Sequence, residues 1–129
     1  MTAQQANRHD PECIFCKIAR GEMNTEFVYR DDRVVVFKDM NPQAEQHVLI
    51  VPVNHYHDLN DLAEAAGSSS EAKEDWQAVL HAVERTAEAL ELTDDSYRII
   101  NNRGKSAGQS VFHIHLHLLS DGKLAERLV

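Results

Sequence analysis

The chain has 129 residues, of which 43% are hydrophobic and 26% charged, and this length and composition are typical of one globular domain. Its 13 Lys and Arg residues against 21 Asp and Glu residues give a formal net charge of -8, which argues against a general nucleic-acid binder. Apolar runs such as Val48–Val51 are too short to span a bilayer, and no secretory pattern opens the sequence. We therefore expect a cytoplasmic protein that binds neither membranes nor nucleic acids.

The first half of the chain predicts a short helix and three strands. Residues 1–10 are polar without apolar periodicity, so we expect a disordered tail there and a single domain over residues 11–129. A short helix is predicted from Pro11, with Gly21 placed to end it. Asp31-Asp32 suits a hairpin turn between the first two strands. The three predicted strands are Glu26–Tyr29, Arg33–Phe37 and His47–Val53.

The second half predicts two helices and two further strands. A short helix is expected over Asp58–Ala65, and Ser68 with Glu71 fits a capping box that opens the next helix. Apolar residues then recur at helical spacing: Trp76, Val79, Leu80, Val83, Ala87 and Leu90. Strands are predicted over Tyr97–Ile100 and Val111–Leu119. This order predicts an α+β fold: an antiparallel five-stranded sheet with one long helix and a short N-terminal helix.

The last predicted strand carries an unusual row of histidines. Because side chains alternate along a strand, His113, His115 and His117 share one face while apolar residues occupy the other, which can pack on the long helix. An exposed edge face is the structural alternative, since histidine is tolerated there. The preceding Gly108-Gln109-Ser110, after a loop with amide and hydroxyl side chains, instead favours a phosphate site. Together these residues suggest an enzyme acting on a phosphate, with an imidazole as nucleophile or general acid.

The two cysteines, Cys13 and Cys16, are too close in sequence to staple a domain together. They permit three interpretations. The first is a redox pair, although no βαβ pattern surrounds the cysteines. The second is two ordinary small residues, and the third is half of a four-ligand zinc site.

These residues resemble the histidine triad (HIT) family of nucleotide hydrolases and transferases, and within it the Hint branch. The resemblance rests on the triad segment Gly108–Leu119, and it extends to four further segments: Cys13–Ile18, Asp39–Pro42, His47–Pro52 with His55, and Tyr97–Asn102. It covers most of the chain between Cys13 and Leu119, and it implies the HIT fold and a homodimer paired across a sheet edge.

The resemblance also implies a chemistry. His115 would attack the α-phosphorus of a nucleotide, giving a nucleotidyl-histidine that water then hydrolyses, without a metal ion. Around the phosphate the resemblance places His117, His47, Gln109, Ser110, Asn102 and Gly108, with Ser110 also near the leaving group. Against the nucleoside it places Phe15, Ile18, Asp39 and Met40, with Asp39 on the ribose hydroxyls.

Several of these roles have structural alternatives when the residues are taken alone. His47 opens an aliphatic strand and reads as a capping or core residue, while Asp39 is an ordinary turn residue before Asn-Pro. Phe15 and Ile18 suit a core face equally well.

For the cysteines, the resemblance favours structural zinc. Some family members hold the ion with two cysteines and two histidines, and those positions match Cys13, Cys16, His55 and His113. His57 is a rival for His55 because it lies only two residues further along.

The predicted activity is hydrolysis of purine nucleoside phosphoramidates to a nucleoside 5'-monophosphate, with AMP derivatives as substrates. The alternatives are a dinucleoside polyphosphate hydrolase of the fragile-histidine-triad type and a nucleotide-binding scaffold with negligible turnover. One region departs from the Hint pattern: Ser120–Lys123 stands where many Hint-like chains carry Gly-Gly-Arg, and Leu124–Val129 follows no recognisable pattern.

Overall fold

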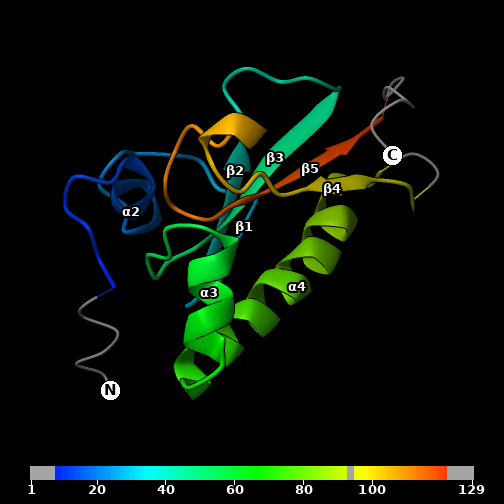
Figure 1. Cartoon of the computed structure of the whole chain (residues 1–129). Helices are drawn as coiled ribbons and strands as arrows, with labels where there is room; N and C mark the ends of the chain where they lie inside the picture. The colour runs from blue at the N-terminus through cyan, green and yellow to red at the C-terminus, as the bar shows by residue number, and fades with distance from the viewer. Residues whose placement is uncertain (1–7, 93–94, 122–129) are drawn as a thin grey trace.

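A computed structural model describes residues 8–92 and 95–121. An antiparallel five-stranded sheet in the order β1-β2-β3-β5-β4 forms its centre (Figure 1). The strands are β1 (Tyr29–Arg30), β2 (Val34–Lys38), β3 (Gln46–Pro52), β4 (Arg98–Ile100) and β5 (Leu116–Ser120). The helices are α2 (Ile14–Ala19), α3 (Leu59–Ala66), α4 (Ser70–Leu90) and the short 3-10 helix η2 (Lys105–Ala107). The predicted α+β class and five-stranded sheet are confirmed.

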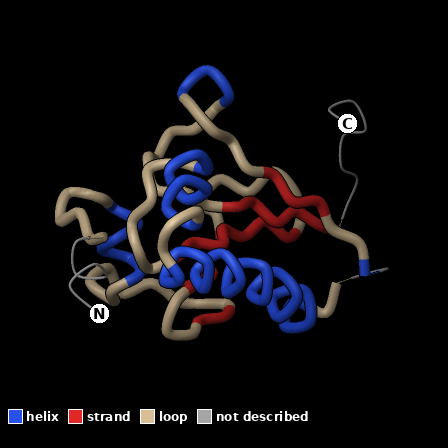
Figure 2. Tube along the Cα trace, turned by 60° about the horizontal axis from the view of Figure 1, so that its bottom comes forward, coloured by secondary structure: helices blue, strands red, loops and turns tan. Residues whose placement is uncertain are grey.

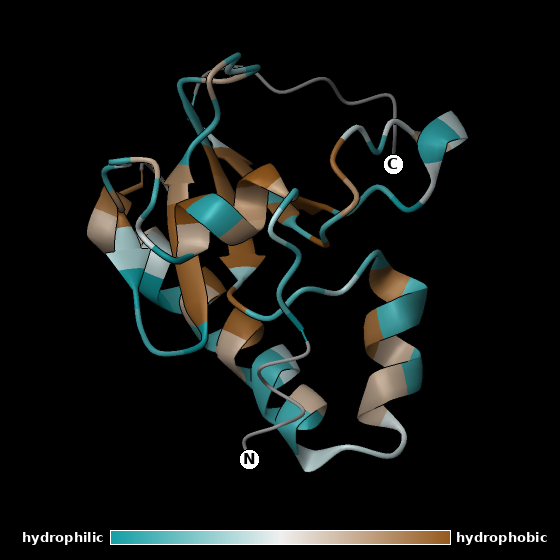
Figure 3. Ribbon diagram, turned by 90° about the vertical axis from the view of Figure 1, so that its left-hand side faces the viewer, coloured by the Kyte–Doolittle hydropathy of each residue, from teal (hydrophilic) through white to brown (hydrophobic). Residues whose placement is uncertain are grey.

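Both faces of the sheet are covered, because the central strands are apolar on both sides. The long helix α4 contacts β1, β2 and β3 on one face, and Figure 2 shows it beside the strands. The buried core under α4 comprises Val34, Val36, Val48, Ile50, Val79, Ala82, Leu92, Leu116 and Leu118. The opposite face carries α2 and a second core of Phe15, Val35, Phe37, Leu49 and Val51. Figure 3 shows the resulting hydrophobic strands at the centre of the molecule.

The long helix differs from its prediction in two details. Its N-cap is Ser69, whose side chain accepts a hydrogen bond from the Ala72 amide, so the predicted Ser68–Glu71 capping box is wrong by one residue. Leu80, expected on the buried face, is 51% exposed, whereas Ala82 is fully buried. Within the described part of the chain, no helix is long and apolar enough to cross a membrane.

The first helix is shorter than predicted. It begins at Ile14 with Cys13 as N-cap, and Gly21 follows its end with a left-handed φ of 81°. Ahead of it, Arg8 is fixed in place: its carbonyl accepts from the His55 amide, and its guanidinium donates to the His55 carbonyl. Arg8 belongs to the tail that was expected to be disordered, yet it makes these defined hydrogen bonds. Residues 1–7 lie outside the described residues.

The strand with the histidines also begins later than predicted, at Leu116 instead of Val111. Residues 111–115 make other backbone contacts: the Ile114 amide donates to the Tyr56 carbonyl, and the Asn101 side chain donates to the His115 carbonyl. Phe112, expected on the apolar face, is 39% exposed and stacks on the His57 ring. This irregular segment breaks the simple alternation, so the histidines do not form one row.

Candidate active site

Three of the predicted histidines, His47, His115 and His117, lie near one another at the β3–β5 pair. Leu49 lies opposite His117 and Leu119 opposite His47 in the register, which makes His47 and His117 diagonal neighbours on one face. His47 Nε2 lies 2.9 Å from His117 Nδ1, and the His115 and His117 ring centroids are 5.2 Å apart. His113, the remaining member of the triad, points into a different cluster.

Hydrogen bonds fix the tautomer of His115. Its Nδ1 lies 2.8 Å from the His113 carbonyl oxygen. A carbonyl oxygen only accepts, so the Nδ1 atom carries the ring proton and Nε2 keeps its lone pair. The Phe15 ring meets the His115 ring edge-on, with centroids 5.1 Å apart, and restricts its orientation. His115 therefore presents an unprotonated Nε2 as a preoriented nucleophile.

A second hydrogen-bond chain fixes His47 and His117. The Gln43 amide donates to His47 Nδ1 at 3.0 Å, so the proton of a neutral His47 ring lies on Nε2. That Nε2–H donates to His117 Nδ1, and the His117 proton is consequently on Nε2. Asp39 Oδ2 lies 3.5 Å from His47 Nε2 and adds a carboxylate beside the pair. The neutral His117 ring can therefore donate a proton or a hydrogen bond from Nε2.

Burial keeps the rings of His115 and His117 uncharged near neutral pH. Burial lowers the pKa of His115 below its usual value of 6.5. Burial is also the main cause that lowers the pKa of His117 to about 4, with the neighbouring rings of His115 and His47 adding to the effect. Both imidazoles are therefore neutral at pH 7, as a nucleophile and a hydrogen-bond donor require.

A pocket of about 550 Å³ opens beside His115 and His117. This size suits a nucleotide-sized ligand, and the lining is mainly apolar with a few polar groups at one end. It contains most of the residues predicted for nucleotide binding: Phe15, Ile18, Asp39, Met40, Asn102, Gly108 and Ser110. The Met40 side chain is fully exposed at this pocket, and Ser110 is exposed as well.

Gln109 differs from the expectation. Its side chain is 3% exposed and does not line the pocket, because its amide already has three backbone partners. Oε1 accepts from the Gly104 amide, and Nε2 donates to the carbonyls of His57 and Val111. Gln109 therefore fixes the loop that presents Gly108 and Ser110, instead of pointing at the pocket itself.

Other pocket residues were not predicted from the sequence. Phe37 and Leu49 lie on the pocket face of β2 and β3, and the alternation of these strands could have identified them. The remaining ones carry no motif and come together only in the fold: Ile14, Met23, Thr25, Lys38 and Val111. Asn101 was also missed, although its amide fixes the backbone of His115.

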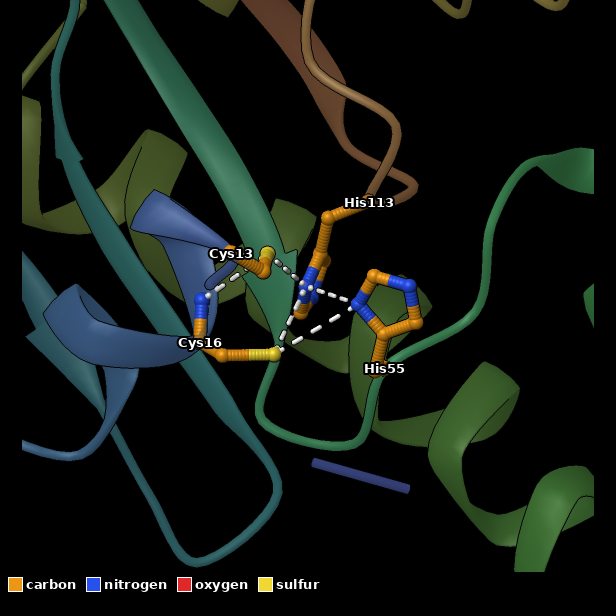
Figure 4. A group of neighbouring side chains, drawn as sticks. All are labelled: Cys13, Cys16, His55 and His113. Carbon is orange, nitrogen blue, oxygen red and sulfur yellow. Dashed lines mark hydrogen bonds between the residues drawn. The ribbon is translucent and has the colours of Figure 1, made fainter. Parts of the chain in front are cut away.

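A second cluster brings together all four predicted metal ligands: Cys13, Cys16, His55 and His113 (Figure 4). Their donor atoms lie within 4.8 Å of one another. His113 Nδ1 is 3.3 Å from Cys13 Sγ, 3.5 Å from Cys16 Sγ and 3.2 Å from His55 Nδ1. His57 stacks on Phe112 instead, so it is not part of this cluster.

The cluster is built to offer lone pairs to a cation. His113 Nε2 lies 2.8 Å from the Pro52 carbonyl, which places its proton on Nε2 and leaves Nδ1 free toward the sulfurs. Burial lowers the pKa of His113 to about 3 and raises the pKa of the Cys16 thiol to about 12. The buried Cys16 sulfur beside neutral imidazoles would gain a charge partner when a cation binds, and all four donor atoms converge, so the group can hold a metal ion.

This fold is that of the histidine triad proteins. The family model described as HIT domain matches residues 20–124, so the chain belongs to the HIT family. The chain is an enzyme, a HIT family hydrolase.

Three relatives illustrate the likeness. The purine nucleoside phosphoramidase of Escherichia coli K12 is 37% identical over 117 residues, covering 91% of this chain and 93% of that protein. A 14 kDa zinc-binding protein of Zea mays is 36% identical over 110 residues, covering 85% of this chain and 82% of that protein. The crystal structure of a HIT family hydrolase from Legionella pneumophila superposes with a TM-score of 0.78 at 34% identity, covering 90% of this chain and 98% of that one.

Proposed function

We propose that the protein hydrolyses purine nucleoside phosphoramidates to nucleoside 5'-monophosphates through a nucleotidyl intermediate on His115. The observation that carries the proposal is the tautomer of His115: its Nδ1–H donates to the His113 carbonyl, so Nε2 is free to attack beside a nucleotide-sized pocket. The likeness to the E. coli purine nucleoside phosphoramidase supports the substrate class.

In the first step, the Nε2 lone pair of His115 attacks the α-phosphorus and the P–N bond to the leaving amine breaks. The leaving nitrogen takes up a proton and departs as a neutral amine. Ser110, an exposed hydroxyl of the pocket lining, is suited to relay that proton from solvent water, and the water that attacks in the second step returns one proton to solvent. His117 donates from Nε2 to a phosphoryl oxygen, because the chain from the Gln43 amide through His47 holds its proton there.

In the second step, water attacks the phosphorus and the bond between phosphorus and His115 Nε2 breaks. The products are the nucleoside monophosphate and the original neutral imidazole. Asn102 and Gly108 complete the phosphate end. Gly108 has a left-handed φ of 101°, a backbone conformation that other residues rarely adopt, so glycine suits this position of the loop.

The nucleoside occupies the apolar part of the pocket. Phe15 and Ile18 project from α2, and Phe37 meets Phe15 edge-on at 5.6 Å between centroids. Asp39 is suited to accept hydrogen bonds from the ribose hydroxyls, with Met40 beside it.

We further propose that the four-residue cluster holds a structural zinc ion. Zn²⁺ at about 2.1 Å from nitrogen and about 2.3 Å from sulfur places tetrahedral ligands roughly 3.4–3.8 Å apart. The measured separations, 3.2 Å between the two Nδ1 atoms and 3.3–3.5 Å between sulfur and nitrogen, differ by only a few tenths of an ångström. When bound, the ion would supply a closed structural crosslink between α2 and the segments outside the strands that carry His55 and His113. The free thiols of Cys13 and Cys16 suit a reducing compartment such as the cytoplasm.

We also propose a homodimer paired through β4, the edge strand beside β5. Tyr97 and Ile99 are 42% and 38% exposed there, and β4 pairs on one side only among the described strands. Light scattering at micromolar concentration is expected to give twice the chain mass, and Ile99→Lys is expected to give the single-chain mass. A monomeric wild-type protein would contradict this assignment.

The activity is tested by following AMP release from adenosine 5'-phosphoramidate and, separately, from a diadenosine polyphosphate. We expect faster release from the phosphoramidate and loss of release in His115→Ala. Faster cleavage of the dinucleotide would assign the enzyme to the polyphosphate hydrolases. Tight AMP binding without turnover of either substrate would identify a nucleotide-binding scaffold.

A further inference from the structure

We propose that the Cys13–Cys16–His55–His113 cluster controls the nucleotide site, with His113 as the positioning residue that links them. The inference rests on the proposed function for the identity of the ligand, but its geometry is independent of turnover. A cation bound in the cluster would thus favour nucleotide binding, and nucleotide binding would tighten the hold on the cation.

The first link is His113 itself. Its side chain belongs to the cluster through Nδ1, whereas its carbonyl oxygen accepts the Nδ1–H of His115 at 2.8 Å. The residue is completely buried, and its Nε2 is anchored on the Pro52 carbonyl at the end of β3. When a cation also binds the Nδ1 atom, the ring is fixed at both nitrogens, and this restricts the position of the His113 backbone carbonyl. A shift of that carbonyl would release His115 from the tautomer that frees Nε2.

The second link is helix α2. Cys13 is the N-cap of this helix and Cys16 lies in its first turn. The pocket residues Ile14, Phe15 and Ile18 project from the same helix. A helix of six residues is too short to be stable by itself, so it depends on its tertiary contacts. Fixing both sulfurs therefore also fixes the apolar wall of the pocket.

The links matter because residues 111–115 lie outside the regular sheet. Their backbone is held by individual hydrogen bonds, from Gln109 to Val111, from Ile114 to Tyr56 and from Asn101 to His115, instead of by a ladder. Such a segment has few restraints to keep the nucleophile in place when the His113 side chain is loose.

Reciprocity of binding free energies allows a test on the intact, metal-loaded protein. Zn²⁺-loaded protein is titrated with a chelator of known affinity, with and without saturating AMP. A titration without protein measures the Zn²⁺ binding of AMP itself, and this contribution is subtracted. We expect AMP to raise the apparent Zn²⁺ affinity on the order of tenfold, a typical coupling between two sites. Equal chelator curves with and without AMP would overturn the proposal.

A second readout needs neither turnover nor AMP. Nitrogen-15 NMR of the imidazole rings reports which nitrogen of His115 carries the proton. We expect the metal-loaded wild type to hold the proton on Nδ1, and the Cys13→Ser variant to lose that single tautomer. Val79→Ala is the matched control, because it weakens the core on the opposite face of the sheet and leaves the cluster intact.

The outcomes separate the inference from the proposed function. If Cys13→Ser keeps the His115 tautomer of the wild type, the coupling is wrong. If Cys13→Ser does not fold, the chelator titration of the wild type decides. If AMP fails to bind the wild type, the proposed function is wrong, and the tautomer comparison alone decides whether the cluster controls His115.

Discussion

Protonation of His117 is expected to make the protein acid-sensitive by a measurable amount. Burial lowers the pKa of this ring from 6.5 to about 4, so the unfolded chain takes up the proton at a higher pH than the native state does. Stability that is present above pH 6.5 is therefore lost as the pH falls from 6.5 to about 4. The difference between the two pKa values corresponds to at most about 3 kcal/mol of unfolding free energy.

The comparison of wild type with His117→Gln isolates this contribution. Urea unfolding is measured at several pH values between 7.5 and 4, and the difference in unfolding free energy between the two proteins is plotted against pH. Because the groups that lie away from His117 respond to acid alike in both proteins, we expect the wild type to lose up to about 3 kcal/mol more than the variant across this window. His81→Gln is the matched control, since His81 is an exposed residue of α4 on the opposite face of the sheet. Parallel curves for wild type and His117→Gln would refute the reasoning.

Three further predictions concern residues that hold the site. Gln109→Ala should lower the unfolding free energy by about 1–3 kcal/mol, because three backbone groups lose a buried hydrogen-bond partner. Unchanged urea unfolding would contradict this role and would instead fit a Gln109 side chain that contacts the phosphate directly. Asp75→Asn should lower the unfolding free energy by about 3–5 kcal/mol, because the 1% exposed carboxylate accepts hydrogen bonds from Arg33, Asn54 and Tyr56. Glu74→Gln removes an exposed ion pair of the same arginine and should lower it by less than about 1 kcal/mol. Equal losses for the two variants in urea unfolding would contradict this prediction. Cys16→Ser should lower the zinc content measured by elemental analysis from one equivalent per chain; full occupancy would exclude the sulfur as a ligand.

The sheet and the long helix were predictable because their apolar periods are regular. Val34–Phe37 and Val48–Val51 are runs of β-branched, aliphatic and aromatic residues, and the apolar face of α4 repeats at helical spacing, so the pattern of burial indicates their conformation. Leu80 shows the limit of this reasoning, because a helical pattern gives the apolar stripe but not where the sheet beneath it ends.

The site was predictable as a set of residues but not as a geometry. Alternation along a strand predicts three histidines on one face. The backbone from Val111 to His115 instead lies outside the sheet, and the His113 side chain lies beside Cys13 and Cys16. That division depends on long-range hydrogen bonds, such as the one from Ile114 to the Tyr56 carbonyl, which no local pattern encodes. The burial of Gln109 likewise depends on His57, 52 residues away in the chain.

The nucleophilic role of His115 is tested most directly by intact-protein mass spectrometry after rapid mixing with adenosine 5'-phosphoramidate. We expect a transient adduct with the mass of one adenylyl group on the wild type, and peptide mapping is expected to place it on His115. His115→Asn should bind AMP and form no adduct. Turnover by the wild type with an adduct on another residue, or full turnover by His115→Asn, would contradict the account.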